Sequence, residues 1–294
     1  MELLERLHSK NLIKPPPFVV GGTQYLTIMG SMAYGVSSDS SDMDVYGFCI
    51  PPKDIVFPHL AGVIPGFGTQ IQKFEQFQQH HIVDKESRKE YDINVYNIIK
   101  YFQLVMENNP NMIDSLFTRE NCVLGATKIA NHVRDNRKLF LHKGSWHKFK
   151  GYAFSQMHKM RIKNPDEESV RFDMVQKYGF DVKFAYHVVR LLNEVEQIMV
   201  EHDLDLMKNN EQLKAIRNGE WKIEQIEQYF YDKEKSLEHV YSTSTLRHRP
   251  DEDQIKRILL ECLEEYYGSL DGAVETVDQY KAMLRQIQQI VSKV

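Results

Sequence analysis

The sequence has little cysteine, no long apolar run and no repeating unit. Its 294 residues include only three cysteines, Cys49, Cys122 and Cys262, which lie too far apart for a disulfide framework or a zinc site. No apolar run approaches the ~18 residues that span a membrane, and the acid-containing N-terminus is not typical of a secretory signal. These absences predict a reducing, cytoplasmic environment and no membrane partner.

Neither sign of charge dominates the chain. It has 37 Lys and Arg against 41 Asp and Glu, a formal net charge of -4, with 42% hydrophobic and 27% charged residues. This composition is typical of a globular protein and excludes a disordered or fibrous chain. The slightly acidic balance of charge also argues against a protein whose whole surface binds nucleic acid.

Strand-like and helix-like segments alternate over the first ~120 residues, and the remaining spacing is almost wholly helical. Strands are expected at residues 23–29, 42–50, 76–83, 91–95 and 112–117, with a helix at 97–107. Later helices are expected near residues 125–135, 145–162, 180–202, 220–240, 252–267 and 273–292. The pattern predicts an α+β fold, with a catalytic domain of residues 1–124 followed by an all-α helical domain of residues 125–294.

Two carboxylates, Asp42 and Asp44, lie two residues apart in the expected strand 42–50. Side chains alternate between the faces of a strand, so both point to one side, roughly 6.6 Å apart along the chain. Carboxylates this close repel each other unless a cation lies between them. Mg²⁺ meets that need, because it binds one or two carboxylates together with substrate phosphates.

Gly30 and Ser31 follow the expected strand 23–29, at a point where the chain must turn. Glycine permits backbone angles and close approaches that other residues do not. Ser31 would open a short helix, and free N–H groups at a helix start attract anions. A phosphate-binding turn beside a carboxylate pair predicts a nucleoside triphosphate with Mg²⁺ as the ligand.

A site with two metal ions needs a third carboxylate. Asp92 is the candidate, because its strand is expected to neighbour the strand of Asp42 and Asp44. Its role would be to help deprotonate an attacking hydroxyl, and Glu90, on the same strand face, is the alternative. The adjacent pair His80 and His81 does not predict a metal site, because neighbouring residues of a strand point to opposite faces.

The pattern Gly-Ser-x-Ala-x-Gly, then five residues, then Ser-Asp-x-Asp, spans residues 30–44. It resembles the signature of the DNA polymerase β-like nucleotidyltransferase superfamily. Motifs at residues 109–111, 150–156 and 179–191 resemble its bacterial and phage branch often called YcgL-like. The resemblance implies a small mixed sheet with flanking helices. It also implies transfer of a nucleoside monophosphate from an NTP, such as ATP, to an acceptor hydroxyl with release of pyrophosphate.

The resemblance also assigns roles to residues of the sheet domain. It implies a nucleotide-binding set composed of Gly30, Ser31 and Ser41. It further implies a catalytic, metal-holding set composed of Asp42, Asp44 and Asp92. Two Mg²⁺ ions are expected, with Mn²⁺ as a substitute.

The helical half offers further nucleotide-binding residues, expected to neutralise the charge of the triphosphate and of the leaving pyrophosphate. These are Lys150, Tyr152, Lys183, His187 and Arg190. The last three are spaced i, i+4 and i+7, so they are expected to share one helix face.

Residues 137–163 contain eight Lys or Arg, three His and no acid, interleaved with five aromatic residues. Single-stranded nucleic acids are bound by such combinations, through phosphate contacts and base stacking. A tRNA-like RNA end is therefore the first expected acceptor. A protein side chain and a small metabolite stay open as acceptors, as does a catalytically silent module that binds a nucleotide or a partner.

Overall fold

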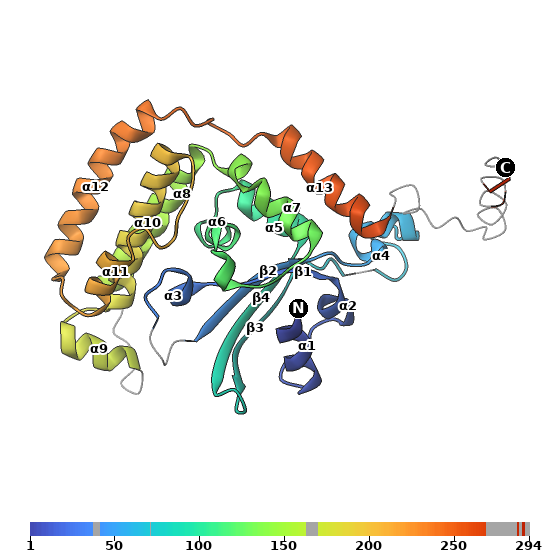
Figure 1. The fold of residues 1–294 in the computed structure, drawn as a ribbon, viewed down its shortest axis with the longest axis horizontal. Coiled ribbons are helices and arrows are strands. Elements are labelled where there is room, and N and C mark those ends of the chain that lie inside the picture. The colour runs from blue at the N-terminus through green and yellow to red at the C-terminus, as the bar shows by residue number, and fades with distance from the viewer. Residues whose placement is uncertain (38–41, 71, 163–169, 269–286, 288–289, 292–294) are drawn as a thin grey trace.

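The computed structural model describes residues 1–294 except 38–41, 71, 163–169, 269–286, 288–289 and 292–294. A mixed sheet lies at the centre, helices cover both of its faces, and the later helices form a bundle beside it (Figure 1). The strands are β1 (Thr23–Ile28), β2 (Met43–Cys49), β3 (Gln76–Asp84), β4 (Lys89–Asn97) and β5 (Val123–Ala126), in the order β3-β4-β2-β1-β5. The predicted fold class, a small mixed sheet with flanking helices followed by a helical region, is confirmed.

The helices fall into two groups along the chain. Around the sheet lie α1 (Glu2–Ser9), α2 (Pro17–Gly22), α3 (Gly30–Ala33), α4 (Lys53–Val56), α5 (Ile98–Met106), α6 (Pro110–Phe117) and α7 (Lys128–Asp135). Then follow α8 (Gly144–Ile162), α9 (Val170–Tyr178), α10 (Val182–Glu201), α11 (Asn210–Arg217), α12 (Ile223–Thr243) and α13 (Glu252–Tyr267). Within the described ranges, no helix has both the length and the apolar character needed to cross a membrane. The helix expected at 273–292 lies almost wholly outside the described residues.

The two faces of the sheet bury different sets of side chains, as the alternation of a strand requires. One face carries Leu26, Val45 and Ile93, which pack in one hydrophobic cluster with Leu4 and Leu7 of α1. The opposite face carries residues such as Tyr25 and Phe48, which belong to the larger core shared with the later helices. The sheet is therefore covered on both sides.

One hydrophobic core joins the sheet to the bundle. The cluster that contains Phe48 extends through Trp146 of α8 and Leu191 of α10 to Cys262 of α13. Strand β5, at residues 123–126, crosses the predicted boundary between residues 124 and 125. The division into a catalytic domain of residues 1–124 and a helical domain of residues 125–294 stays a proposal.

Residues 112–117, expected as a strand, form most of helix α6, so that prediction is wrong. The Asn109 side chain accepts a hydrogen bond from the backbone N–H of Met112 at 3.4 Å, and Pro110 occupies the first turn. Both features are typical of a helix start. The Asn-Asn-Pro-Asn run therefore ends α5 and also begins α6.

A buried charged network links α10 to the sheet domain. Arg190 is 2% exposed, and its guanidinium donates to Asp114 of α6 and to Glu194, the latter at 2.9 Å. Tyr34, just after α3, donates its hydroxyl to Asp114 at 2.8 Å and lies under the Arg190 guanidinium. Burial raises the pKa of the Glu194 carboxyl well above its usual value, against the opposing effect of Arg190.

Replacing Arg190 with leucine is expected to destabilise the protein by about 3–5 kcal/mol, because Asp114 and Glu194 would stay buried without their cation. Urea unfolding measures this loss. Arg161→Leu is the control, since it removes an exposed ion pair with Glu227, for which about 1 kcal/mol or less is expected. Equal losses in the two variants would contradict a structural role for the buried network.

Candidate functional site

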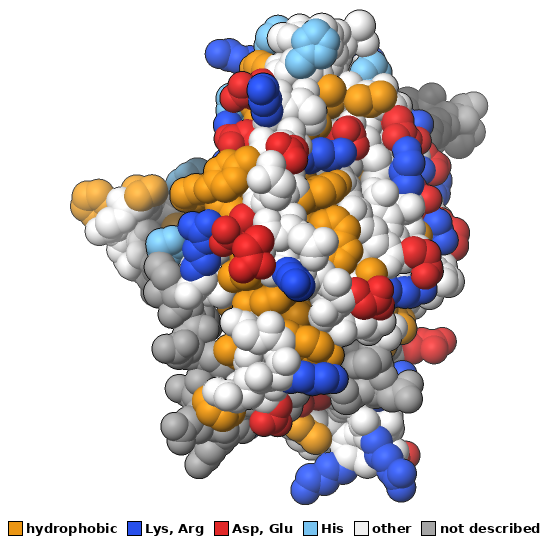
Figure 2. All heavy atoms as spheres, turned by 90° about the vertical axis from the view of Figure 1, so that its left-hand side faces the viewer, with side chains coloured by type: hydrophobic (Ala, Val, Ile, Leu, Met, Phe, Trp, Pro, Cys, Tyr) orange, Lys and Arg blue, Asp and Glu red, His pale blue; other side chains and the backbone are white. Residues whose placement is uncertain are grey.

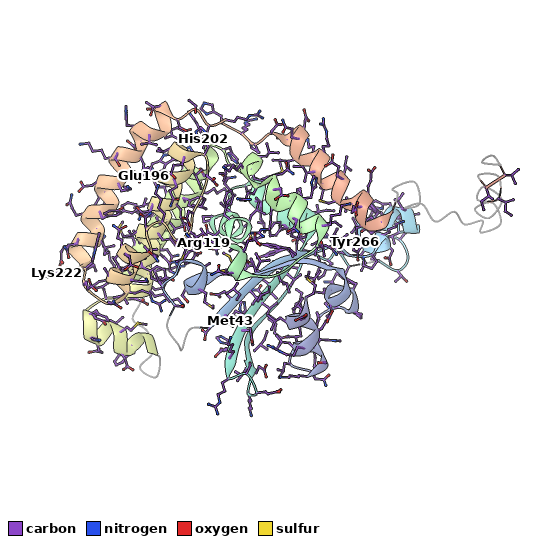
Figure 3. All side chains as sticks on the ribbon, in the orientation of Figure 1. Met43, Arg119, Glu196, His202, Lys222 and Tyr266 are labelled. Carbon is purple, nitrogen blue, oxygen red and sulfur yellow. The ribbon has the colours of Figure 1, made fainter. Side chains whose placement is uncertain are left out.

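Three carboxylates gather where β2 and β4 begin. Asp44 and Asp92 are direct neighbours in the parallel pairing of these strands, so their side chains share one face. Asp42 immediately precedes Met43, the first residue of β2, which is labelled in Figure 3. Asp42 is exposed, whereas Asp44 and Asp92 are half-buried. The prediction that the strand of Asp92 neighbours that of Asp42 and Asp44 is confirmed.

The turn at Gly30 lies directly against Asp44. Gly30 has a φ of +65°, and a Cβ at this position would overlap the Oδ2 atom of Asp44. Beside it, the backbone N–H of Met29 donates to the carbonyl of Asp44 at 2.7 Å. The left-handed backbone and the close approach together require glycine here. Ser31 follows in α3 and is half-buried, so the predicted phosphate-binding turn does lie beside the carboxylates.

Negative charge accumulates at these carboxylates. Burial raises the pKa of Asp44, and the charges of Asp92 and Asp42 raise it further, while Lys183 opposes the shift. Burial likewise raises the pKa of Asp42, and Lys183 again lowers it. Lys183 is an exposed residue in the first turn of α10. Among the cations of the helical half that were predicted to bind the nucleotide, Lys183 is therefore one that the fold brings close to the carboxylates.

A bulge in β3 turns two histidines toward the carboxylates of β4. The register with β4 shifts within residues 79–82, and His81 has a φ of +54°. His80 Nδ1 lies 3.2 Å from Asp92 Oδ2, and the backbone N–H of His81 donates to Asp92 Oδ1 at 2.8 Å. The ring of His81 contacts Glu90 at 2.7 Å. The prediction that adjacent histidines face opposite sides is wrong, because the bulge breaks the alternation on which it was based.

Two of the cations predicted to bind the nucleotide lie elsewhere. Arg190 belongs to the buried network with Asp114 and Glu194, so its guanidinium is committed to those carboxylates. Sequence spacing alone did not show that Arg190 is buried, and its predicted nucleotide contact stays a prediction. Lys150 lies 3.2 Å from Glu234 of α12 and is also engaged.

Of the three remaining residues predicted to bind the nucleotide, the structure describes Tyr152 and His187. Tyr152 is half-buried near Tyr46, whose pKa is raised mainly by burial, with Tyr152 adding to the shift. The ring of His187 packs on that of Tyr186, with 4.2 Å between centroids. Ser41 lies outside the described residues, as does Lys163 at the end of the basic stretch.

Four of the seven described cations of the basic stretch 137–163 are paired with acids from other segments. Lys138 lies 2.6 Å from Asp203, and Arg161 lies 2.6 Å from Glu227. Figure 2 faces the bundle side of the molecule and shows Lys and Arg interspersed with Asp and Glu. The folded stretch is therefore not a continuous basic surface.

The carboxylate set suits a hard cation that shares its ligands with a bound substrate. Within the described segments, no group of three or more His, Cys, Asp or Glu side chains is arranged to hold an ion. Mg²⁺ rarely needs such a group, since it binds through one or two carboxylates plus substrate phosphates. Asp42, Asp44 and Asp92 supply oxygen donors, and burial, with smaller contributions from the charges of Asp92 and Asp42, raises the pKa of Asp44.

Comparison with known proteins identifies a family and a remote structural neighbour. Residues 2–281 match the family described as RNA repair pathway DNA polymerase beta. A solved structure, that of a nucleotidyltransferase-like protein from Exiguobacterium sibiricum 255-15, is 11% identical with a TM-score of 0.28. The similarity covers 89% of this chain and 78% of that chain. No match was found among curated proteins.

Gly30→Ala is expected to weaken Mn²⁺ binding about 10- to 100-fold, as for other changes that displace a metal ligand. The added Cβ would overlap Asp44 Oδ2. Gly66→Ala is a matched control, because Gly66 also has a positive φ, +82°, but a Cβ there meets nothing within 4 Å. Calorimetric titration measures both affinities, and wild-type binding by Gly30→Ala would refute the proposed close approach.

Asp44→Asn is expected to raise the Tm of the metal-free protein at neutral pH. The folded-state pKa of Asp44 is raised from 3.8, mainly by burial. The carboxyl therefore contributes most stability below its unfolded pKa and loses that contribution as the pH rises through its folded pKa. The gain from asparagine should be present near neutral pH and vanish below about pH 4.

Thermal unfolding across this pH range measures the effect. The same substitution at the exposed Asp232 is the control, with a change within about 0.5 kcal/mol at every pH. A lower Tm for Asp44→Asn at neutral pH would show that the ionised carboxylate stabilises the fold.

Proposed function

The chain belongs to the RNA repair pathway DNA polymerase beta family. It is thus a nucleotidyltransferase, and we propose that it transfers a nucleoside monophosphate from an NTP to a hydroxyl of an RNA end, with Mg²⁺ as cofactor and release of pyrophosphate. The observation that carries the proposal is the register of Asp44 beside Asp92, under the turn at Gly30. Phosphoryl transfer needs clustered oxygen ligands and a phosphate-binding turn at one place.

The sheet domain is proposed to hold the triphosphate and the metal. Gly30 and Ser31 would bind the phosphates, because their turn lies against the carboxylates. Asp42, Asp44 and Asp92 would hold the ions. Bound Mg²⁺ stabilises the charge on the attacking and leaving oxygens. Ser41, adjacent to Asp42, stays in the proposed nucleotide-binding set.

Asp92 is proposed to receive the proton of the acceptor hydroxyl. As that proton leaves, the acceptor oxygen bonds to the α-phosphorus, and the bond from this phosphorus to the pyrophosphate oxygen breaks. Contacts from His80 and from the backbone N–H of His81 hold the two oxygens of Asp92 in place. Each carboxylate oxygen has a second lone pair, so both contacts are compatible with this role.

Lys183 is proposed to neutralise the phosphates from the side of the bundle. Its charge already lowers the pKa of both Asp42 and Asp44, which places it within electrostatic reach of a ligand bound there. A lysine near the leaving pyrophosphate stabilises the charge that develops on it. Tyr152 and His187 stay proposed nucleotide contacts, whereas Lys150 would first have to leave Glu234.

An RNA end is the proposed acceptor because the family description names an RNA repair pathway. A protein side chain or a small metabolite would present a hydroxyl to Asp92 in the same way. A silent nucleotide-binding module would have no chemical need for three clustered carboxylates, and these are retained.

Transfer of label from an α-labelled NTP to RNA tests the proposal. Asp42→Asn/Asp44→Asn should abolish transfer, and Asp92→Asn should slow it about 10²- to 10⁴-fold, the range for losing a general base. Glu90→Gln is the matched control on the same strand face, and it should retain activity. Chelation of divalent ions should stop the reaction and Mg²⁺ should restore it. Undiminished transfer by the double variant would exclude the proposed site.

A further inference from the structure

We propose that the acceptor strand of RNA docks on the outer end of the β3–β4 hairpin, between its tip and Asp92. The inference rests on the proposed function, in which RNA is the acceptor, and adds the surface that binds this RNA. This surface, here called the hairpin surface, consists of the tip, residues 84–89, and of His80, His81 and Val83. It lies apart from the basic stretch of residues 137–163 that the sequence indicates.

The tip carries positive charge that the fold leaves available. Within the described part of the chain, exposed cations at the tip have no ion-pair partner: Lys85, Arg88 and Lys89. The neighbouring acids are paired with cations of the N-terminal segment: Lys10, just after α1, lies 3.1 Å from Asp84 and 2.5 Å from Glu86, and Arg6 of α1 lies 3.8 Å from Asp84. Figure 2 shows Lys and Arg side chains projecting at the lower end of the molecule, where the hairpin lies in Figure 1.

Two exposed imidazole rings lie between the tip and Asp92. The side chain of His81 is 82% exposed and that of His80 is 43% exposed, with 6.5 Å between ring centroids. Val83, 51% exposed, pairs with Glu90 and so shares this face. Exposed histidine rings stack on unpaired bases and hydrogen-bond to the sugar–phosphate backbone. An apolar side chain beside them extends the stacking surface.

The spacing suits a strand whose terminal hydroxyl reaches the carboxylates. Arg88, in the turn just before β4, and Asp92 are four residues apart, about 13 Å along an extended chain. Phosphates recur about every 3.4 Å along the axis of one helical strand, so the last few nucleotides would span this distance. β3 is an edge strand of the sheet, so its outer side is not hydrogen-bonded to another strand.

The basic stretch on α8 is the less suitable surface. Four of its seven described cations are paired with acids from other segments: Lys138 with Asp203, Lys148 with Glu107, Lys150 with Glu234 and Arg161 with Glu227. A polyanion would have to displace those acids to contact most of the stretch. At the hairpin tip no such exchange is needed, so the charge complementarity favours the hairpin surface.

Binding of a fluorescent single-stranded RNA oligonucleotide tests the inference. Lys85→Glu/Arg88→Glu should weaken binding about tenfold or more and reduce the slope of log K against log salt by about 1.4, the value for two lost phosphate contacts. Lys148→Glu/Lys159→Glu on α8 is the matched control, with the same change of charge at exposed lysines. It should bind RNA like the wild type, and both variants should keep the wild-type KM for NTP.

The outcomes separate the docking surface from the proposed function. If the wild type transfers label to RNA but the hairpin variant binds RNA normally, the hairpin surface is excluded and the function stands. Weakened binding in the α8 variant alone would assign docking to the basic stretch. Label on protein rather than RNA would overturn both proposals.

Discussion

The parallel pairing of β2 with β4 is the constraint on which the rest of this molecule depends. It places Asp44 beside Asp92 on one face of the sheet, and Val45 beside Ile93 on the other. A slip of one residue would exchange those faces, exposing the apolar pair and burying the carboxylates. Burial of Val45 and Ile93 under α1 therefore fixes the register, and the register in turn creates the site. The same pair of strands therefore packs into the core on one face and carries the carboxylates on the other.

The ionised Asp44 carboxylate is expected to oppose the stability of the metal-free protein. Asp44 is half-buried beside like charges, which is why its pKa is raised. The shared hydrophobic core offsets this cost, and the buried network around Arg190 fixes the position of α10. Two turns before Arg190, the same helix presents Lys183 to the carboxylates. Arg190, which sequence spacing assigns to the nucleotide, thus anchors the helix that carries Lys183.

Charge along the chain and charge at the surface differ in this protein. Residues 137–163 contain no acid, yet their cations pair with Asp203, Glu227 and Glu234 in the folded chain. The hairpin tip looks balanced in sequence, but Lys10, just after α1, and Arg6 pair with its acids, and its own cations have no ion-pair partner in the described part of the chain. A net charge of -4 therefore conceals a local positive surface at one end of the molecule.

Local rules determined much of this protein from its sequence. The glycine turn, the spacing of Asp42 and Asp44, the strand of Asp92 and the longer helices follow from backbone sterics and periodicity, which act over a few residues. The tertiary structure decided the bulge that brings His80 and His81 to Asp92, and the burial of Arg190. It also decided which cations are paired. These features depend on partners far away in the chain, so no local pattern encodes them. Asn109 and Pro110 did carry the signal for α6, because asparagine is a preferred N-cap residue and proline is favoured at the first helical position.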